Sequence, residues 1–128
     1  EYGPLYEKYG LGTTIWSPLA SGALTGKYLE GIPEGSRASL AGYEWLKKSM
    51  VESDRGQERM TRVASLVLIA EKLNVSMSKL AIAWCLLNKN VSTVILGASK
   101  IEQLEENLKS VEVLPLLDET IQKELLLI

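Results

Sequence analysis

Only two segments of this 128-residue chain have the character of β-strands, and helical sequence separates them. Residues 11–16 mix β-branched and aromatic side chains and end before Pro18, and residues 92–97 form a β-branched, apolar run that ends at Gly97. The second run is typical of a parallel strand buried on both faces. Strands that alternate with helices predict an α/β fold with parallel strands. Two strands cannot close a sheet or cover its faces, so we expect the other strands to lie in a part of the protein outside this chain.

Six helical segments are expected around these strands. They are residues 4–9, 43–51, 57–73 and 78–88, a helix that begins at Ser99 and a last helix capped by Asp118. The run Ser99-Lys100-Ile101-Glu102 has the form of a capping box, and we expect Ile101, Leu104 and Leu108 to face inward. Residues 53–56 are expected to break the helices. Residues 17–42 are rich in Gly, Ser and Pro, and a loop of this length is usually functional or disordered.

The charge balance and the missing residue types exclude several classes of function. Lys plus Arg number 14 and Asp plus Glu 16, so no basic field attracts nucleic acid or anionic lipid. Histidine is absent, which removes His-liganded zinc and His-based catalysis supplied by this chain. The single cysteine, Cys85, fits a reducing compartment. The longest apolar run, residues 80–87, is far shorter than the roughly 20 residues of a membrane span. We expect a soluble chain without metal and, since it begins with Glu1, a piece of a longer protein.

The first candidate site follows the first strand. In parallel α/β folds, ligands bind where loops leave the carboxyl ends of the strands. A flat aromatic ring there can stack on a planar cofactor, and the polar turn behind it can supply amides and hydroxyls to a diphosphate. The residues are Trp16, Ser17, Pro18, Leu19, Ala20 and Ser21. The alternative is a core tryptophan followed by an ordinary Ser-Pro turn.

The second candidate site follows the second strand, where Gly97 and Ser99 open a helix whose first amides favour an anion. Gln103, Glu106 and Asn107 share a face with that first turn and could hold a ribose or a purine. The alternative is a simple cap and a solvated helix face. Two cations of the long loop, Lys27 and Arg37, could clamp phosphates, although most loop cations are merely solvated.

Five sequence segments carry a resemblance to a known family. The run Trp16-Ser17-Pro18-Leu19-Ala20-Ser21-Gly22-Ala23-Leu24-Thr25-Gly26-Lys27-Tyr28 closely resembles the nicotinamide-binding loop of aldo-keto reductases. Four further motifs, residues 36–40, 42–47, 80–86 and 96–99, are similar, in family order, to the β-subunits of voltage-gated potassium channels. The resemblance covers the chain from end to end. It implies that residues 1–128 are the C-terminal half of a TIM (β/α)8 barrel, an incomplete domain of an α/β protein.

The resemblance also implies a cofactor, NADP(H), and a role for each candidate residue. Trp16 stacks on the nicotinamide, residues 17–21 line the diphosphate, and Lys27 and Arg37 reach over it. The adenosine end with its 2′-phosphate is held by Gly97, Ser99, Gln103, Glu106 and Asn107. Two positions depart from the channel-subunit pattern: Gly35 replaces an aromatic residue, which leaves that contact in doubt, and Ser21 replaces a cysteine.

None of the family's catalytic residues can be carried onto this chain, because they lie in the other half of the barrel. The resemblance implies a slow NADPH-dependent carbonyl reductase whose main role is to bind a potassium channel α-subunit in the cytoplasm and to modulate its gating and trafficking. The parent would be a homo- or hetero-tetramer of β-subunits, held peripherally at the plasma membrane through the channel. The alternatives are a metabolic NADP-dependent aldo-keto reductase and a truncated, non-catalytic fragment.

Overall fold

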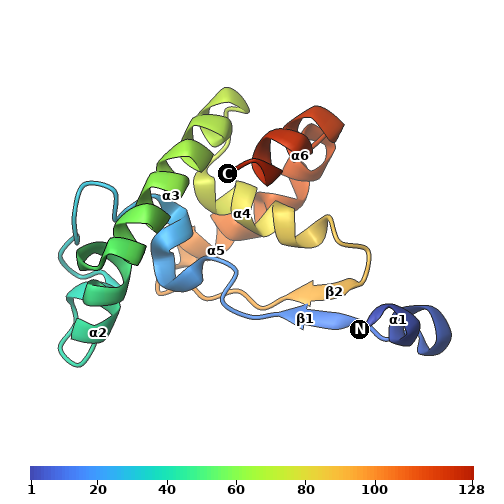
Figure 1. The fold of residues 1–128 in the computed structure, drawn as a ribbon, viewed down its shortest axis with the longest axis horizontal. Helices are drawn as coiled ribbons and strands as arrows, with labels where there is room; N and C mark the ends of the chain where they lie inside the picture. Colours follow the sequence, from blue (N-terminus) through green and yellow to red (C-terminus); the bar gives the residue numbers. More distant parts are fainter.

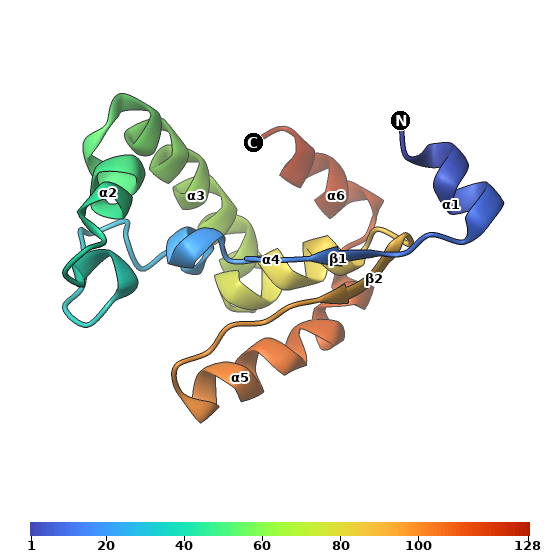
Figure 2. The same ribbon diagram turned by 90° about the horizontal axis from the view of Figure 1, so that it is seen from below.

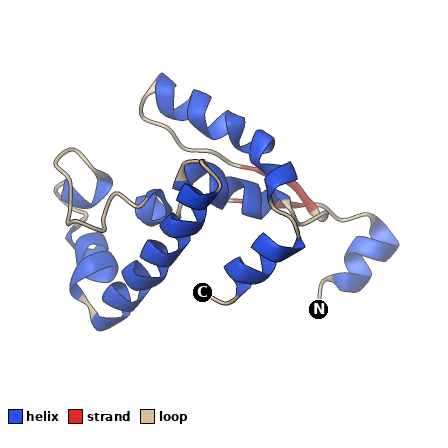
Figure 3. Cartoon of the chain, turned by 90° about the horizontal axis from the view of Figure 1, so that it is seen from above, coloured by secondary structure: helices blue, strands red, loops and turns tan.

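The computed structural model describes residues 1–128 as a largely helical molecule with one short sheet (Figures 1 and 3). The elements, in order, are α1 (Gly3–Tyr9), β1 (Thr13–Ile15), the 3-10 segments η1 (Ala20–Thr25) and η2 (Arg37–Ser39), α2 (Glu44–Lys47), the π-helical η3 (Lys48–Glu52), α3 (Asp54–Lys72), α4 (Met77–Leu86), β2 (Val91–Val94), α5 (Ile101–Leu108), the 3-10 segment η4 (Lys109–Leu116) and α6 (Glu119–Leu126). Helix α1 lies at one end of the molecule and α2 at the other (Figures 1 and 2). None of the helices combines the length and the apolar character needed to cross a bilayer.

The two strands pair in parallel, which confirms the partial α/β arrangement expected from the sequence. Ile15 lies opposite Val94, and the Ile95 amide donates to the Ile15 carbonyl at 2.8 Å. The prediction that the second strand is buried on both faces is wrong, because Ser92 and Thr93 are exposed. Each strand of a two-stranded sheet has one unpaired edge, and there are too few neighbouring strands and helices to cover both faces.

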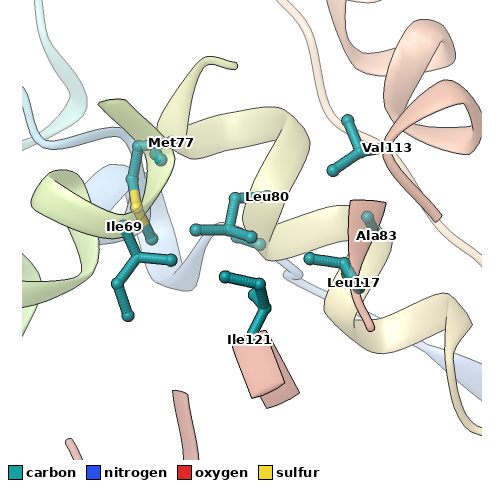
Figure 4. Close-up of a cluster of buried hydrophobic side chains, with 9 residues drawn as sticks. Ile69, Met77, Leu80, Ala83, Val113, Leu117 and Ile121 are labelled. Carbon is teal, nitrogen blue, oxygen red and sulfur yellow. The ribbon is translucent and has the colours of Figure 1, made fainter. Parts of the chain in front are cut away.

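Helix α4 lies at the centre of the larger of two apolar clusters (Figure 4). The helix is apolar almost all round, as the sequence predicts, and Ser76 caps it by accepting a hydrogen bond from the Lys79 amide at 3.3 Å. The buried members of this cluster come from α3, α4, η4 and α6 and from the residue that follows η4: Ile69, Ala70, Met77, Leu80, Ala81, Ala83, Val113, Leu117 and Ile121. Segments far apart in sequence are therefore joined around α4.

The long loop has an apolar core of its own, which joins it to α2 and η3. The second cluster consists of Ala23, Tyr28, Ala38, Leu46 and Met50. The first three belong to the loop of residues 17–42, and their side chains are buried. Apolar burial of this kind stabilises a loop that its Gly, Ser and Pro content alone would leave without order.

Helix α3 begins three residues earlier than expected. The segment at residues 53–56 is no break, because Ser53 is the N-cap and its Oγ accepts a hydrogen bond from the Gly56 amide at 3.1 Å. Gly56 is buried in the first turn and touches the backbone of η3. The two residues that suggest an interruption in the sequence have other roles: Ser53 caps α3, and Gly56 allows η3 to approach α3 closely.

Helix α5 presents its apolar side to solvent, on the outer side of the molecule (Figure 2). Ile101, Leu104 and Leu108 are 73%, 42% and 58% exposed, so the prediction that they face inward is wrong. The helix packs on α4 and η4 through its other side, where Asn107 is buried. Ser99 does not cap it either: the N-cap residue is Lys100, which makes no side-chain cap hydrogen bond.

Candidate functional site

The two candidate segments leave the same edge of the sheet. Parallel strands place their carboxyl ends side by side, and here Ile15 and Val94, the last residues of β1 and β2, are paired. Trp16 follows directly and is 81% exposed, so it does not belong to the core of this chain. The indole is free to meet a ligand at the edge where parallel α/β folds bind theirs.

Behind Trp16 the backbone makes a tight turn with several residues in the left-handed region. Ser17, Ala20 and Ser21 have φ values of 53°, 47° and 57°, and Gly22 has φ 96°. Hydrogen bonds close the turn from the Ala20 amide to the Ser17 carbonyl at 2.9 Å and from the Gly22 amide to the Leu19 carbonyl at 2.8 Å. Left-handed conformations cost non-glycine residues about 1–3 kcal/mol each, and they concentrate at ligand sites.

Lys27 folds back onto this turn. Its ammonium nitrogen lies 5.1 Å from the centroid of the Tyr28 ring. The Tyr28 hydroxyl in turn donates a hydrogen bond to the Ser21 carbonyl at 3.3 Å. The turn, the cation and the buried aromatic ring therefore form one contiguous unit.

Neither cation of the long loop is neutralised. The four ion pairs of the molecule join Lys47 to Glu52, Arg62 to Glu58, Lys72 to Glu124 and Lys79 to Glu106. Lys27 and Arg37 have no carboxylate within ion-pair distance, and both are exposed. Lys27 is an unpaired cation beside a turn with hydroxyl and amide donors, an arrangement that suits an anion such as a phosphate.

The segment after β2 is arranged differently. The Ser99 amide and hydroxyl both donate to the Gln103 Oε1, at 2.9 and 3.1 Å, and Gly97, Ser99 and Gln103 are exposed. Gln103 thus stands in the first turn of α5 and reaches back to the residue before the cap. This hydrogen bonding holds the loop from Gly97 to the helix in one conformation while its outer side faces solvent.

Glu106 and Asn107 are less exposed than Gly97, Ser99 and Gln103. Glu106 pairs with Lys79 at 3.4 Å, and a hydrogen bond from the Ser76 hydroxyl, assisted by the Lys79 charge, lowers the pKa of Glu106. The carboxylate is therefore ionised at neutral pH and able to accept hydrogen bonds. Asn107 is buried, and its main-chain carbonyl accepts a hydrogen bond from the Ser110 hydroxyl at 2.6 Å.

Sequence reasoning does not single out Tyr28. The signal that could have found it is that Tyr28 is the only aromatic residue between residues 17 and 42, inside a run rich in small residues. A large apolar ring in such a run has to be buried somewhere, and here it is buried against the candidate turn.

These residues fit a dinucleotide cofactor. The exposed indole of Trp16 can stack on a planar ring, and the turn with the free ammonium of Lys27 beside it can receive phosphates. Arg37, an exposed and unpaired cation of the same long loop, can add charge. No cluster of three or more Cys, Asp or Glu side chains is placed to hold a metal ion. A family model described as "Aldo/keto reductase family" matches residues 1–123.

Proposed function

The chain belongs to the aldo/keto reductase family, and we propose that it supplies the NADP(H)-holding part of a carbonyl reductase. The observation that carries the proposal is the exposed Trp16 followed by the left-handed turn and the unpaired Lys27, all at the carboxyl edge of the sheet. Stacking, backbone donors and positive charge are the three interactions that a nicotinamide dinucleotide needs from its protein.

The proposed assignment follows the order of the residues along the sheet edge. Trp16 stacks on the nicotinamide, residues 17–21 receive the diphosphate, and Lys27 and Arg37 contribute charge to it. Gly97, Ser99 and Gln103 meet the 2′-phosphate at the start of α5, and Glu106 and Asn107 hold the adenosine. NADP(H) would supply a hydride to a carbonyl carbon. The proton for the carbonyl oxygen requires a general acid, and we assign no catalytic residue to this chain.

We propose that the rest of a (β/α)8 barrel covers the strand edges and the apolar surface that this chain leaves exposed. The unpaired edges of β1 and β2 and the exposed apolar side of α5, with Ile101, Leu104 and Leu108, are surfaces that a barrel buries. This arrangement would make residues 1–128 the C-terminal half of the barrel, an incomplete domain. The apolar stripe of α5 supports this proposal because an isolated protein rarely exposes such a surface.

The role in the cell is also a proposal, supported by the four motifs shared with potassium channel β-subunits. In this proposal a homo- or hetero-tetramer binds a channel α-subunit in the cytoplasm, modulates its gating and trafficking, and stays peripheral to the plasma membrane. A metabolic NADP-dependent aldo-keto reductase shares the Trp16 to Ser21 loop and is the second candidate. Asn in place of His among the catalytic residues of the intact barrel would favour the channel subunit.

The intact protein, of which we propose this chain to be a part, is expected to bind NADPH more tightly than NADH. The reason is that only NADPH carries the 2′-phosphate proposed to meet Ser99. Isothermal titration with both dinucleotides measures the difference. Ser99→Asp should weaken the binding of NADPH about tenfold and leave the binding of NADH unchanged, since the new carboxylate would repel the 2′-phosphate that only NADPH carries. Thr120→Asp, which places a carboxylate at the exposed start of α6, is the matched control. Equal affinities of the unmodified intact protein for the two dinucleotides would contradict the proposed contact between Ser99 and the 2′-phosphate.

Trp16→Ala is expected to weaken NADPH binding by about 1 kcal/mol or more, which is roughly fivefold or more, because the stacking surface is lost. The change should leave the thermal midpoint close to its original value, since the indole contributes little to the core. Trp45→Ala is the control, because Trp45 is also exposed (62%) but lies on α2. An unchanged affinity in the Trp16 variant would contradict the stacking role.

A further inference from the structure

Tyr28 is the largest fully buried side chain of the molecule. It is 1% exposed and packs with Ala23, Ala38, Leu46 and Met50. It also lines a surface hollow of about 440 Å³ together with Leu29, Val51, Gln57, Met60, Thr61 and Ala64. The ring therefore packs between its own loop, through Ala23 and Ala38, and the helical segments α2 and η3, through Leu46 and Met50.

The fixed ring holds the candidate turn through its hydroxyl. The Tyr28 hydroxyl donates to the Ser21 carbonyl at 3.3 Å, and Ser21 is one of the residues held at positive φ. A residue in that region relaxes unless its surroundings fix it. The hydrogen bond therefore links a turn residue held at positive φ to a fully buried side chain.

The same ring holds Lys27 on its face. The ammonium lies 5.1 Å from the ring centroid, and no carboxylate competes for it. Gly22 provides the room: a Cβ there would lie 2.7 Å from Lys27 Cε and 2.8 Å from Lys27 Nζ. The missing side chain at position 22 and the ring at position 28 together define where the ammonium sits.

We propose that Tyr28 is a positioning residue that holds the Lys27 ammonium against the turn of residues 17–22, ready for a cofactor phosphate, with Gly22 leaving the space for it. This inference rests on the proposed function and adds to it how the site is organised before the ligand arrives. A preorganised cation loses less conformational freedom on binding than a solvated lysine does. Tyr28 acts through Lys27 and Ser21 and does not itself touch the phosphate.

A double-mutant cycle on NADPH affinity tests the coupling. Lys27→Met and Tyr28→Leu should each weaken NADPH binding about tenfold. The double variant should be weaker than Lys27→Met only by the roughly twofold to fivefold that the hydrogen bond to Ser21 contributes, because the rest of the ring's effect acts through the lysine. Tyr28→Phe keeps the ring and should lose only about twofold to fivefold, through the missing hydrogen bond. Losses that multiply in the double variant would overturn the proposal, since Tyr28 would then act independently of Lys27.

A second readout needs no cofactor and stays informative where Tyr28→Leu does not fold. In the chain labelled with ¹³C-lysine, the ε-methylene protons of Lys27, identified by Lys27→Arg, should be shifted upfield by the Tyr28 ring. The shift should persist in Tyr28→Phe and disappear in Gly22→Ala, where the new Cβ displaces the lysine. An ordinary chemical shift in the unmodified chain would overturn the positioning. If the Lys27 ε-methylene protons are shifted upfield as expected but NADPH does not bind, the proposed function is rejected while the placement of Lys27 on the Tyr28 ring is supported.

Discussion

Gly56→Ala is expected to lower the free energy of unfolding by about 3 kcal/mol, although alanine is the better helix former by about 1 kcal/mol. Gly56 lies in the first turn of α3, where η3 crosses it. A Cβ at this position would be 2.8 Å from the Met50 carbonyl carbon, 2.8 Å from the Ser49 oxygen and 2.9 Å from the Met50 oxygen. Backbone atoms cannot rotate away as a flexible side chain does, so one of the two helices has to shift.

The measurement is urea or thermal unfolding followed by circular dichroism. Gly3→Ala is the matched control, because Gly3 is also helical and has nothing within 4 Å of its Cβ position. That variant should stay within about 0.5 kcal/mol of the original chain. A Gly56→Ala chain as stable as the original, or more stable, would mean that α3 and η3 do not approach each other as described.

Local features of the fold could be predicted from the sequence. Asp118 is recognised as a cap because a cap depends on its own residue and the next three amides. The Asp118 Oδ1 accepts from the Thr120 and Ile121 amides, both at 2.9 Å. The apolar circumference of α4 similarly predicts a buried central helix, and the alternation of strand and helix predicts the parallel pairing.

Features that depend on distant neighbours could not be predicted. The pattern of α5 marks an apolar face, but the pattern does not say which elements are present to cover it, so Ile101 and Leu108 are exposed. Gly56 looks like a helix breaker until the backbone of η3 is placed beside it. At the candidate site the polar turn and its cations follow from residue types, whereas the part played by Tyr28 depends on a hydrogen bond to Ser21 and on a cation seated on its ring.

Removing both cations of the long loop should have the largest effect on ligand binding. The double variant Lys27→Met, Arg37→Met is expected to bind NADPH about 100-fold more weakly, since each charged hydrogen bond to a phosphate contributes a factor of about ten or more. The plot of log affinity against log salt concentration should also become shallower, because fewer ions are exchanged when the phosphates bind. Isothermal titration at several salt concentrations gives both quantities.

The matched control removes the same net charge elsewhere. Lys48→Met, Arg55→Met takes one exposed lysine and one exposed arginine from η3 and α3, and neither of them takes part in an ion pair. A loss caused only by the more negative net charge would appear equally in both double variants and fade together with rising salt. A loss confined to the Lys27 and Arg37 variant, with the salt slope reduced in that variant alone, would assign the two cations to the bound phosphates. Equal losses in the two chains would reduce Lys27 and Arg37 to a general electrostatic contribution and leave the turn after Trp16 without its proposed partners.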